Sequence, residues 1–525
     1  MAAPDAIIVG GGHNGLVAAA YLAKAGAKVT VLERRPLVGG AAVTEELHPG
    51  FRFSRAAYAA GLLRPGIVHD LDLKRYGYEA FVKEPGSFVP FPDGKYLFTY
   101  YDARKTAEEF ARFSKHDAKS YATWSTMWEG FVDLMEPILL NPPPDLDGLW
   151  LHFEKHGQGD LLRRLLSGSA EALLSEYFES EYTKAAICGN AVIGTMVGPK
   201  DAGSAYVFAH HMLGVIDGRR NVWGFVKGGM GAISQALAAA ARDLGVEVRV
   251  DTDVERIVIE DGRAVGVRLH GGKEMRAKAI LSNADPKRTF LGLVGQDRLE
   301  PEFTHAIERF RTDGSATKIN VALSELPDFL ALPGKAVGPQ HRCTIDVASM
   351  LDHLERAFDD AKYGDISREP FLEMYLQSAV DHEMAPPGKH TMTLFTQYTP
   401  YHLRNGTWEG RREEWWGRVL DALDAYCPNV RDAVLWKEVL TPPDLERVFG
   451  LTGGNIFHGE ITPDQMFGFR PAKGWAGYRT PIAGLYLCGS GAHPAGGVLG
   501  APGRNAALVA LEDLHRRNTF KRTGA

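Results

Sequence analysis

Apolar residues near the start of the chain occur in two short runs with a helical pattern between them. The first run is Ala6–Val9, and it leads into a glycine-rich turn. Small residues then recur at helical spacing until Gly26, and the second run, Lys28–Leu32, ends at Glu33. A strand, a helix and another strand in this order predict a βαβ unit with a parallel sheet.

After Tyr58 the pattern becomes helical. From Asp102 to Leu140, aromatic and apolar residues recur mostly three or four positions apart, which predicts one long helix. Asp102 can cap its start, and three consecutive prolines at 142–144 end it. The aromatic stripe is either core or the wall of a substrate cavity. The apolar stretch 131–140 could alternatively dip into a membrane surface.

The α/β pattern returns near Asn221 and again near the C-terminus. A glycine-rich entry, an amphipathic helix, a hairpin turning at Asp261–Gly262 and a strand ending at Asn283 follow one another. From Leu485 to Ala507 a short strand, a glycine-dense turn and a small-residue helix repeat the opening layout. We therefore predict a nucleotide-binding domain in three pieces and a substrate-binding domain inserted between them. The pieces are 1–60, 215–290 and 470–525, and the inserted blocks are 61–214 and 291–469.

Composition narrows the function classes. The chain has 525 residues, 45% of them hydrophobic and 24% charged, with a net charge of -6. Without a basic block we expect no nucleic-acid partner. The 4 cysteines are scattered singly, which argues against a metal site, a redox dithiol or a secreted disulfide framework. We expect a cytoplasmic protein, since no signal peptide or spanning segment is recognisable, with peripheral membrane contact left open.

The first glycine turn has the spacing of a dinucleotide-binding motif. Gly10 permits a tight turn, Gly12 lets the backbone approach a pyrophosphate, and Gly15 lets the helix pack closely on the strand. The helix N-terminus offers free N–H groups to that pyrophosphate, and an acid placed like Glu33 binds a ribose hydroxyl. The alternative is a turn that serves packing alone. The predicted cofactor-binding residues of this segment are Gly10, Gly12, His13, Asn14, Gly15 and Glu33.

The residues after Glu33 favour FAD over NAD. Arg34 follows it, and then Gly39, Gly40 and Ala41. In flavoproteins of the glutathione-reductase type, and especially the amine-oxidase and phytoene-desaturase branch, a basic residue and a glycine pair occur here. A glycine pair allows close approach of the backbone, and a cation can approach the phosphates. A surface turn with solvated arginines is the alternative interpretation.

The chain as a whole resembles the phytoene desaturase and carotenoid isomerase group of FAD oxidoreductases. Within it, the resemblance is to the pyridine nucleotide-disulphide oxidoreductase domain-containing protein 2 branch. It covers nearly the whole sequence and rests on segments in family order, among them VGGGHNGLVAAAYL, ERRPLVGGAA, KGGMGAISQAL, LSNADPKRTF and YLCGSGAHPAGGVLGAPGRNAA. It implies an α/β fold with an α+β second domain: a Rossmann-like FAD-binding domain of glutathione-reductase/amine-oxidase type and a discontinuous substrate domain.

The same resemblance assigns further residues to a noncovalent FAD. Gly489 and Ser490 end a strand where many flavoproteins have Gly-Asp, so here a serine replaces the acid that binds the ribityl chain. The segment from Val498 through Leu499 to Gly500 opens the last helix, which in this branch points N–H groups at the flavin C2 carbonyl. Val254 is where a backbone group near the adenine is expected, although an ordinary hairpin valine would look the same.

Two residues are candidates for chemistry. Amine oxidases place a lysine on a substrate-domain strand near flavin N5, and Lys318 in TKINVAL looks similar; a solvent-facing strand lysine is the alternative. His493 could contact the ring or the substrate, or be a buried turn histidine bonded to backbone. His458 and Glu460 could line the cavity. We find no conspicuous acid/base pair in the sequence, and the hydride chemistry implied by the resemblance does not require one.

Three functions remain open at this point. The first is an FAD-dependent oxidoreductase that desaturates, saturates or isomerises a small apolar substrate, polyene or prenyl-like, with oxygen or a quinone as an electron acceptor. The second is a flavin amine or amino-acid oxidase, which would want an aromatic cage. The third is a non-catalytic FAD-binding protein that works through partners. The sequence does not predict the oligomeric state.

Overall fold

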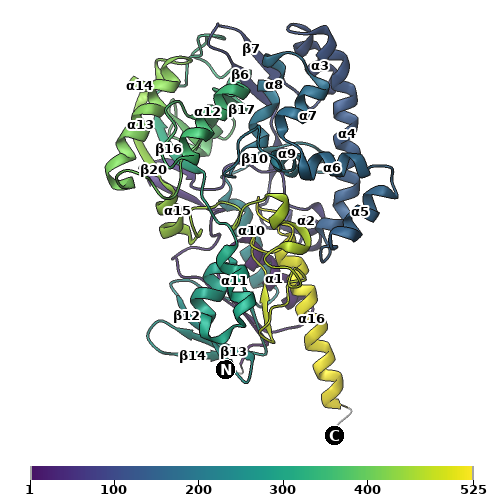
Figure 1. The fold of residues 1–525 in the computed structure, drawn as a ribbon. Coiled ribbons are helices and arrows are strands. Elements are labelled where there is room, and N and C mark those ends of the chain that lie inside the picture. Colours follow the sequence, from purple (N-terminus) through teal and green to yellow (C-terminus); the bar gives the residue numbers. More distant parts are fainter. Residues whose placement is uncertain (1–2, 523–525) are drawn as a thin grey trace.

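The computed structural model describes residues 3–522, with side chains through residue 515. It has a lower part that contains the N-terminus and a broader upper part (Figure 1). The lower part is built on a five-stranded sheet in which every neighbouring pair of strands is parallel. Its strands, in order, are β11 (Glu247–Arg249), β2 (Val29–Leu32), β1 (Ala6–Val9), β15 (Ala279–Ser282) and β21 (Leu485–Leu487). Three distant stretches of sequence therefore form one sheet.

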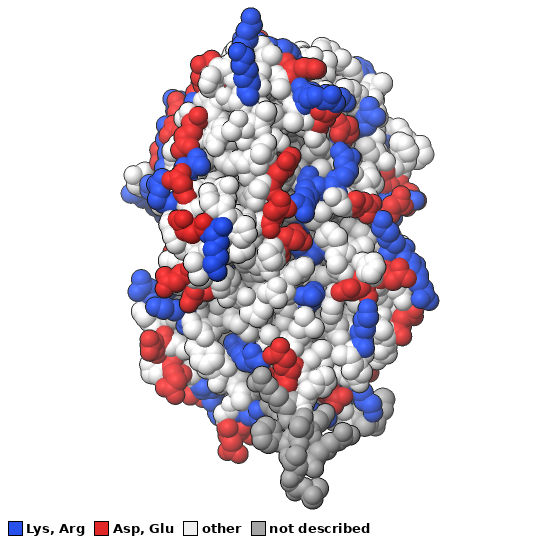
Figure 2. Space-filling view, turned by 90° about the vertical axis from the view of Figure 1, so that its right-hand side faces the viewer, with Lys and Arg blue, Asp and Glu red and all other residues white. Residues whose placement is uncertain are grey.

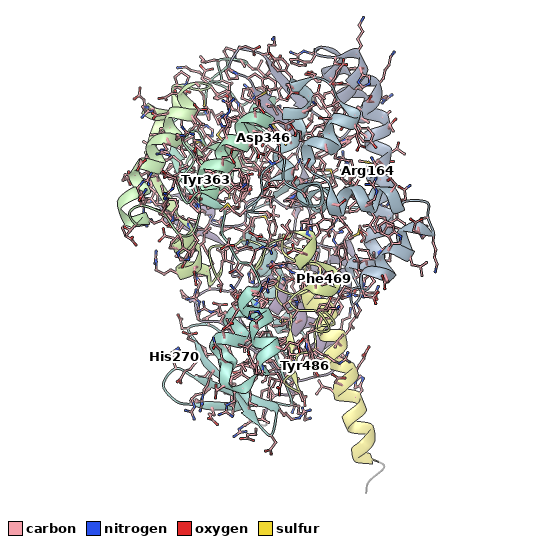
Figure 3. All side chains as sticks on the ribbon, in the orientation of Figure 1. Arg164, His270, Asp346, Tyr363, Phe469 and Tyr486 are labelled. Atoms are coloured by element: carbon pink, nitrogen blue, oxygen red, sulfur yellow. The ribbon has the colours of Figure 1, made fainter. Side chains whose placement is uncertain are left out.

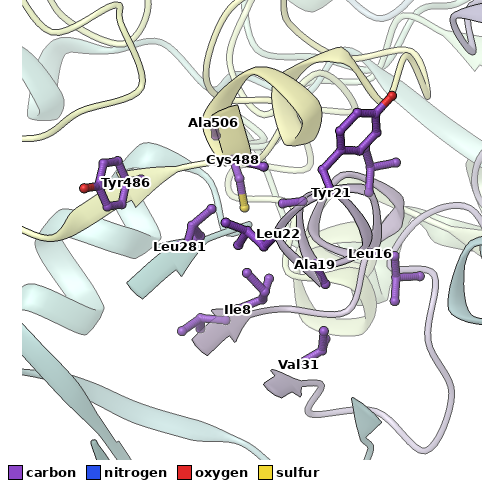
Figure 4. Close-up of a cluster of buried hydrophobic side chains, with 14 of the residues drawn as sticks. Ile8, Leu16, Ala19, Tyr21, Leu22, Val31, Leu281, Tyr486, Cys488 and Ala506 are labelled. Atoms are coloured by element: carbon purple, nitrogen blue, oxygen red, sulfur yellow. The ribbon is translucent and has the colours of Figure 1, made fainter. Parts of the chain in front are cut away.

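Helix α1 (His13–Lys24) covers this sheet and packs against α10 (Gly231–Asp243) and α16 (Ala501–Arg522). Figure 4 shows the apolar side chains at this contact, which come from all three stretches of sequence. The fully buried members include Ile8, Leu22, Leu281, Cys488 and Ala506. The predicted hairpin is confirmed: β12 (Val254–Glu260) and β13 (Arg263–Leu269) pair in antiparallel register, with β14 (Glu274–Arg276) beside them.

A seven-stranded sheet forms the centre of the upper part. In order, its strands are β20 (Val434–Leu440), β16 (Ala316–Leu323), β19 (His390–Gln397), β18 (Phe371–Tyr375), β17 (Thr344–Val347), β6 (Ser87–Pro90) and β7 (Tyr96–Thr99). Because β6 pairs with β17, both inserted blocks of the sequence share this sheet. Alternate residues such as Ile319, Ile345 and Met374 face an apolar core shared with α13 (Trp408–Asp424). The residues between them point to the opposite face of the sheet, where they can line a cavity.

A group of helices covers the remaining side of the upper part, and here one prediction is wrong. The single helix expected from Asp102 is two helices, α3 (Ala103–Ala111) and α4 (Lys115–Leu139). Asp102 caps α3 by accepting from the N–H of Arg104 at 2.9 Å, as expected. The Ser114 hydroxyl caps α4 by accepting from the N–H of Asp117 at 3.1 Å. Aromatic periodicity continues through the break, so the spacing alone did not reveal it.

The cap at Ser114 gives a local prediction. In the Ser114→Ala variant, amide hydrogen exchange in the first turn of α4 is expected to be about fivefold faster, since losing such a cap costs about 1 kcal/mol. Ser120→Ala, in the same helix but away from its terminus, is the matched control and should leave exchange unchanged. Equal exchange in the two variants would contradict the two-helix description.

The two parts contain further helices and strands. The helices are α2 (Pro65–Asp70), α5 (Leu146–Glu154), α6 (Gly159–Ser167), α7 (Ala170–Tyr177), α8 (Glu181–Cys188), α9 (Ser204–His211), α11 (Pro301–Arg309), α12 (Leu351–Lys362), α14 (Val430–Ala433) and α15 (Pro442–Phe449). The strands are β3 (Thr44–His48), β4 (Phe51–Ser54), β5 (Ala80–Val82), β8 (Val215–Ile216), β9 (Arg219–Arg220) and β10 (Gly224–Val226).

The stretch 131–140 does not present an apolar surface to the outside. Phe131, Met135 and Leu139 are each 1% exposed and belong to the core of the helical group. Among the described residues, no helix combines the length and the apolar character needed to cross a bilayer. On the face drawn in Figure 2, lysines and arginines are interspersed with aspartates and glutamates and do not form an extended positive or negative patch.

Candidate active site

A cavity of about 680 Å³ runs from the edge of the parallel sheet to the inner face of the seven-stranded sheet. Most of the predicted cofactor-binding residues line it. Those on its wall are Gly10, Gly12, His13, Asn14, Glu33, Arg34, Gly39, Gly40, Ala41, Val254, Ser490 and Val498. The other four, Gly15, Gly489, Leu499 and Gly500, are not among its lining residues. Lys318 is on the wall, whereas His493 is not among the lining residues.

The two N-terminal glycine segments form one backbone cradle. The N–H of Gly39 donates to the carbonyl of Gly11 at 2.8 Å, and Gly12 and Gly39 form a parallel bridge. A Cβ on Gly12 would lie 2.6 Å from Nδ2 of Asn283, so the Asn283 side chain would have to shift to admit it. With no side chain here, the backbone N–H groups at the N-terminus of α1 can approach and bind a pyrophosphate.

Glu33 is held with both carboxylate oxygens in place. Oε2 accepts from the N–H of Gly11 and Oε1 from the N–H of Arg35, both at 2.8 Å. Each oxygen keeps lone-pair capacity for a ribose hydroxyl. Arg34 donates to the carbonyl of Val448 at 2.9 Å, and burial lowers its pKa. Arg288, which the sequence did not single out, also lines this end of the cavity.

Polar atoms without partners mark the next part of the cavity wall. Among the described residues, Nε2 of His13, Oδ1 of Asn14 and Nδ1 of His458 are buried and have no hydrogen-bond partner. Burial lowers the pKa of His13 to about 3, so its ring is neutral. Asn14 also donates to Oγ of Ser490 at 3.1 Å, which joins the first glycine segment to the last. Because unpartnered buried polar atoms cost free energy, this wall fits a polar, extended cofactor such as FAD.

Arg470 supports this region from behind and was not predicted. It is fully buried, and its guanidinium donates to the carbonyls of Phe457 at 2.8 Å and Ser490 at 2.9 Å. Burial lowers its pKa to about 9. The arginine thus fixes the loop that carries His458 against the strand end that carries Ser490. A lone arginine in a loop segment has no recognisable spacing, so sequence reasoning had no signal for it.

The comparisons with known proteins decide the family. The family model described as "Flavin containing amine oxidoreductase" matches residues 15–502. The chain belongs to the flavin-containing amine oxidoreductase family. It is an FAD-dependent oxidoreductase, and the resemblance stated from the sequence is confirmed.

Individual relatives within and around this family are similar over nearly their whole length. The mouse pyridine nucleotide-disulfide oxidoreductase domain-containing protein 2 is 41% identical over 97% of this chain and 94% of its own. A lycopene-forming phytoene desaturase of Pseudescherichia vulneris is 26% identical over 97% and 99%. The structure of an oxidoreductase from Methanosarcina mazei superposes with a TM-score of 0.63 at 19% identity, covering 97% and 99% of the two chains. That likeness shows a shared fold.

Lys318 is buried on the inner face of the seven-stranded sheet, so the solvent-facing alternative is wrong. The residue is 2% exposed, and its Nζ donates to Oδ1 of Asn320 at 2.7 Å. The ammonium also lies 5.6 Å from the centre of the Tyr58 ring. Burial lowers the pKa of Lys318 to about 7, although Glu438 acts in the opposite direction. An amine with this pKa can hold or release a proton near neutral pH.

His493 occupies the backbone-bonded position that was its alternative. It is fully buried, and Nε2 lies 2.9 Å from the carbonyl oxygen of Ile138 near the end of α4. Burial lowers its pKa to about 4, which keeps the ring neutral. Of the other pair considered, His458 lines the cavity and Glu460 does not. Glu460 instead pairs with Arg311 at 2.9 Å.

Apolar side chains from the helical group and adjoining loops line another part of the cavity. They are Leu62, Tyr121, Trp124, Trp128, Ile187, Ile193, Met212 and Phe457. The aromatic stripe of α4 was expected to be either core or the wall of a cavity, and it is both. Trp124 and Trp128 belong to the core and also line the cavity. A wall of this kind suits an apolar ligand.

The structure also brings together two acids that the sequence analysis did not pair. Asp346 on β17 lies directly opposite Glu373 on β18, and both line the cavity. No pattern in the sequence indicates that these two acids are neighbours. In the sequence, each acid stands alone within a short apolar run, which is unusual for a charged residue. Only the pairing of the strands shows that the two acids are neighbours.

A disulphide chemistry is not supported by the thiols. Within the described part of the chain, Cys188, Cys343, Cys427 and Cys488 are all buried and unpaired. Burial raises the pKa of each thiol, which makes the reactive thiolate scarce.

Proposed function

We propose that this protein transfers hydride between an apolar substrate, polyene or prenyl-like, and N5 of a noncovalently bound FAD. Desaturation, saturation and redox-assisted isomerisation of a double bond are the reactions that belong to this class. The observation that carries the proposal is the joining of an apolar aromatic wall, with Trp124 and Trp128, to the glycine cradle of Gly12 and Gly39 in one cavity. The similarity to a phytoene desaturase agrees with it.

In this proposal the bound FAD supplies the hydride acceptor or donor. The glycine cradle and the N-terminus of α1 hold its pyrophosphate, Glu33 binds its ribose, and Ser490 with Asn14 holds the far end. Trp124, Trp128 and their apolar neighbours orient the substrate and keep water away. Lys318 holds or accepts the proton that accompanies hydride transfer, directly or through a water molecule.

The proposal is tested by mixing the purified, FAD-loaded protein anaerobically with polyenes, prenyl hydrocarbons, quinones and amines. Flavin absorbance then reports reduction, or reoxidation of a prereduced sample. We expect an unsaturated apolar compound to react about tenfold faster than an amine of equal chain length, since apolar pockets discriminate by roughly this factor. Quinones and oxygen are expected to act only as acceptors of electrons from reduced flavin.

A flavin amine oxidase is the second candidate, favoured by the aromatic rings around the inner sheet face. Tyr58 lies 5.1 Å from Tyr375 and 5.5 Å from Phe395, centre to centre, close to the acids Asp346 and Glu373. Flavin reduction by amines alone would select this candidate and overturn the first. If no small molecule changes the flavin while binding to another protein persists, the non-catalytic alternative holds.

A further inference from the structure

Asp346 and Glu373, called here the acid pair, lie side by side on the cavity face of the seven-stranded sheet. They are register partners in the antiparallel pairing of β17 with β18. Their sequence neighbours, including Ile345 and Met374, belong to the apolar core on the opposite face. Asp346 is 8% and Glu373 7% exposed, yet both line the cavity. Figure 3 labels Asp346 within the outline of the upper part of the molecule.

A lysine lies beside the acid pair. Lys83 is 3% exposed and lines the same cavity. Its Nζ donates to Oγ1 of Thr344 and, at 3.2 Å, to the hydroxyl of Tyr375. An ammonium group has three donors, so these two bonds leave one for a ligand. Burial lowers the pKa of Lys83 to about 8, with Glu373 acting in the opposite direction, so the side chain is mostly charged at neutral pH.

Burial and mutual repulsion limit the negative charge of the acid pair, and Lys83 offsets the charge that remains. Burial raises the pKa of Asp346 well above its usual range, and the neighbouring Glu373 raises it further. Burial also raises the pKa of Glu373, against the effects of Lys83 and of hydrogen bonds from Tyr58 and Tyr375. Neighbouring buried carboxyls oppose each other's ionisation. The remaining negative charge is offset by the charge of Lys83.

One atom of the acid pair is left unpaired. Oδ1 of Asp346 is buried and has no hydrogen-bond partner among the described residues. Glu373, in contrast, is bonded by the hydroxyls of Tyr58 and Tyr375. Leaving a buried polar atom unpaired costs free energy, so a ligand atom that bonds it is favoured. The unpaired oxygen of Asp346 and the third donor of Lys83 are therefore the available contacts.

We propose that Asp346, Glu373 and Lys83 bind the hydroxyl group of an otherwise apolar substrate. This inference rests on the proposed function and adds a polar end to its substrate. A hydroxyl both donates and accepts, so it can pair with Oδ1 of Asp346 whether or not that carboxyl is protonated, while accepting from Lys83. An amine would bring a second positive charge beside Lys83, and a carboxylate would bring a negative charge beside the acid pair.

Calorimetric titration of the oxidised, FAD-loaded protein tests the inference with four probes that share one ten-carbon prenyl skeleton. The probes are geraniol, geranylamine, geranic acid and the diene hydrocarbon of the same skeleton. We expect geraniol to bind about tenfold tighter than the hydrocarbon, as a hydrogen bond to a charged or acidic buried group provides. The amine and the acid are expected to bind no tighter than the hydrocarbon.

Variants of Asp346 show whether the preference arises at this site. Asp346→Leu is similar in size but cannot hydrogen-bond, and the ratio of hydrocarbon to geraniol dissociation constants should fall to about one. Asp346→Asn keeps a hydrogen-bonding group and should retain most of the preference. Asp359→Leu, on the exposed side of α12, is the control and should not change the ratio. Bound flavin per protein is measured for each variant, and the ratio itself is compared only among flavin-loaded samples.

The outcomes separate this inference from the proposed function. Equal binding of geraniol and hydrocarbon, or tighter binding of the amine or the acid, overturns the hydroxyl site, even if the hydrocarbon reduces the flavin. A geraniol preference unchanged in Asp346→Leu also overturns it. A geraniol preference that is lost in Asp346→Leu and kept in Asp346→Asn supports the hydroxyl site. This holds even if no compound exchanges electrons with the flavin, because that result would contradict only the proposed function.

Discussion

Replacing Gly15 by alanine is expected to remove most of the flavin from the purified protein. A Cβ at this position would lie 2.3 Å from the carbonyl oxygen of Gly10 and 3.2 Å from side-chain atoms of Ile8 and Asn283. The carbonyl oxygen of Gly10 is part of the backbone and cannot rotate away as a side chain could. The start of α1 would therefore have to move away from β1. The N–H groups at the start of the helix would then no longer face the pyrophosphate. We expect about tenfold less flavin per protein, measured from visible absorbance.

A matched glycine shows that the effect is local. Gly417 lies within α13, and a Cβ there would meet nothing within 4 Å. Gly417→Ala should keep its flavin and gain about 0.5 to 1 kcal/mol of helix stability. Circular dichroism of both variants checks that each is folded. Full flavin content in folded Gly15→Ala would contradict a cofactor held at the start of α1.

Replacing Lys318 by methionine is expected to slow the reaction of flavin with substrate about 100-fold, the usual contribution of a positioned acid or base. Because the pKa of Lys318 is about 7, its free amine becomes the main form as the pH rises through that value. In the unmodified protein a step that needs the free amine should therefore speed up across this range. Lys318→Met should lose this pH dependence together with the rate. Single-turnover flavin reduction at a series of pH values measures both.

The same substitution is expected to stabilise the protein, which separates lost activity from lost folding. The lysine pKa falls from 10.5 in the unfolded chain to about 7 in the fold, so the unfolded chain binds the proton more tightly. The resulting cost is full below about pH 7 and disappears towards pH 10.5. Below pH 7, Lys318→Met should raise the unfolding free energy by several kcal/mol, and by progressively less as the pH increases above 7.

A neighbouring lysine provides the control for both measurements. Lys437 lies on β20 beside β16, pairs with Glu413 at 2.6 Å and is not among the lining residues. Lys437→Met should change neither the rate nor its pH dependence. A rate that keeps its midpoint near pH 7 in Lys318→Met would show that another group titrates.

Local spacing was sufficient for the parts of the site that lie within one short segment. The turn from Gly10 to Gly15 and the acid Glu33 belong to a βαβ unit whose order fixes where each residue lies. The second glycine pair was predicted by analogy, and the structure adds that Gly39 bonds to Gly11. The hairpin at Gly262 was also predictable from the sequence, because a two-residue turn of this kind favours glycine. In the structure this glycine has a φ of +73°.

Spacing was insufficient where a residue's role depends on what packs against it. Lys318 has the same sequence context whether it faces solvent or a cavity, and only the sheet and the Tyr58 ring decide that it is buried. The break before Ser114 depends on a cap that competes with helix continuation, while the aromatic spacing passes through it unchanged.

The sequence alone determined the dinucleotide-binding motif, the flavoprotein resemblance and the α/β class, because each is encoded in contacts between residues close along the chain. Only the tertiary structure decided that Asp346 meets Glu373, that Lys83 offsets their charge, and that Arg470 joins the loop of Phe457 to the strand end of Ser490. These contacts join residues far apart in sequence. Their pKa values and hydrogen bonds arise from burial, which depends on the packing of the whole chain.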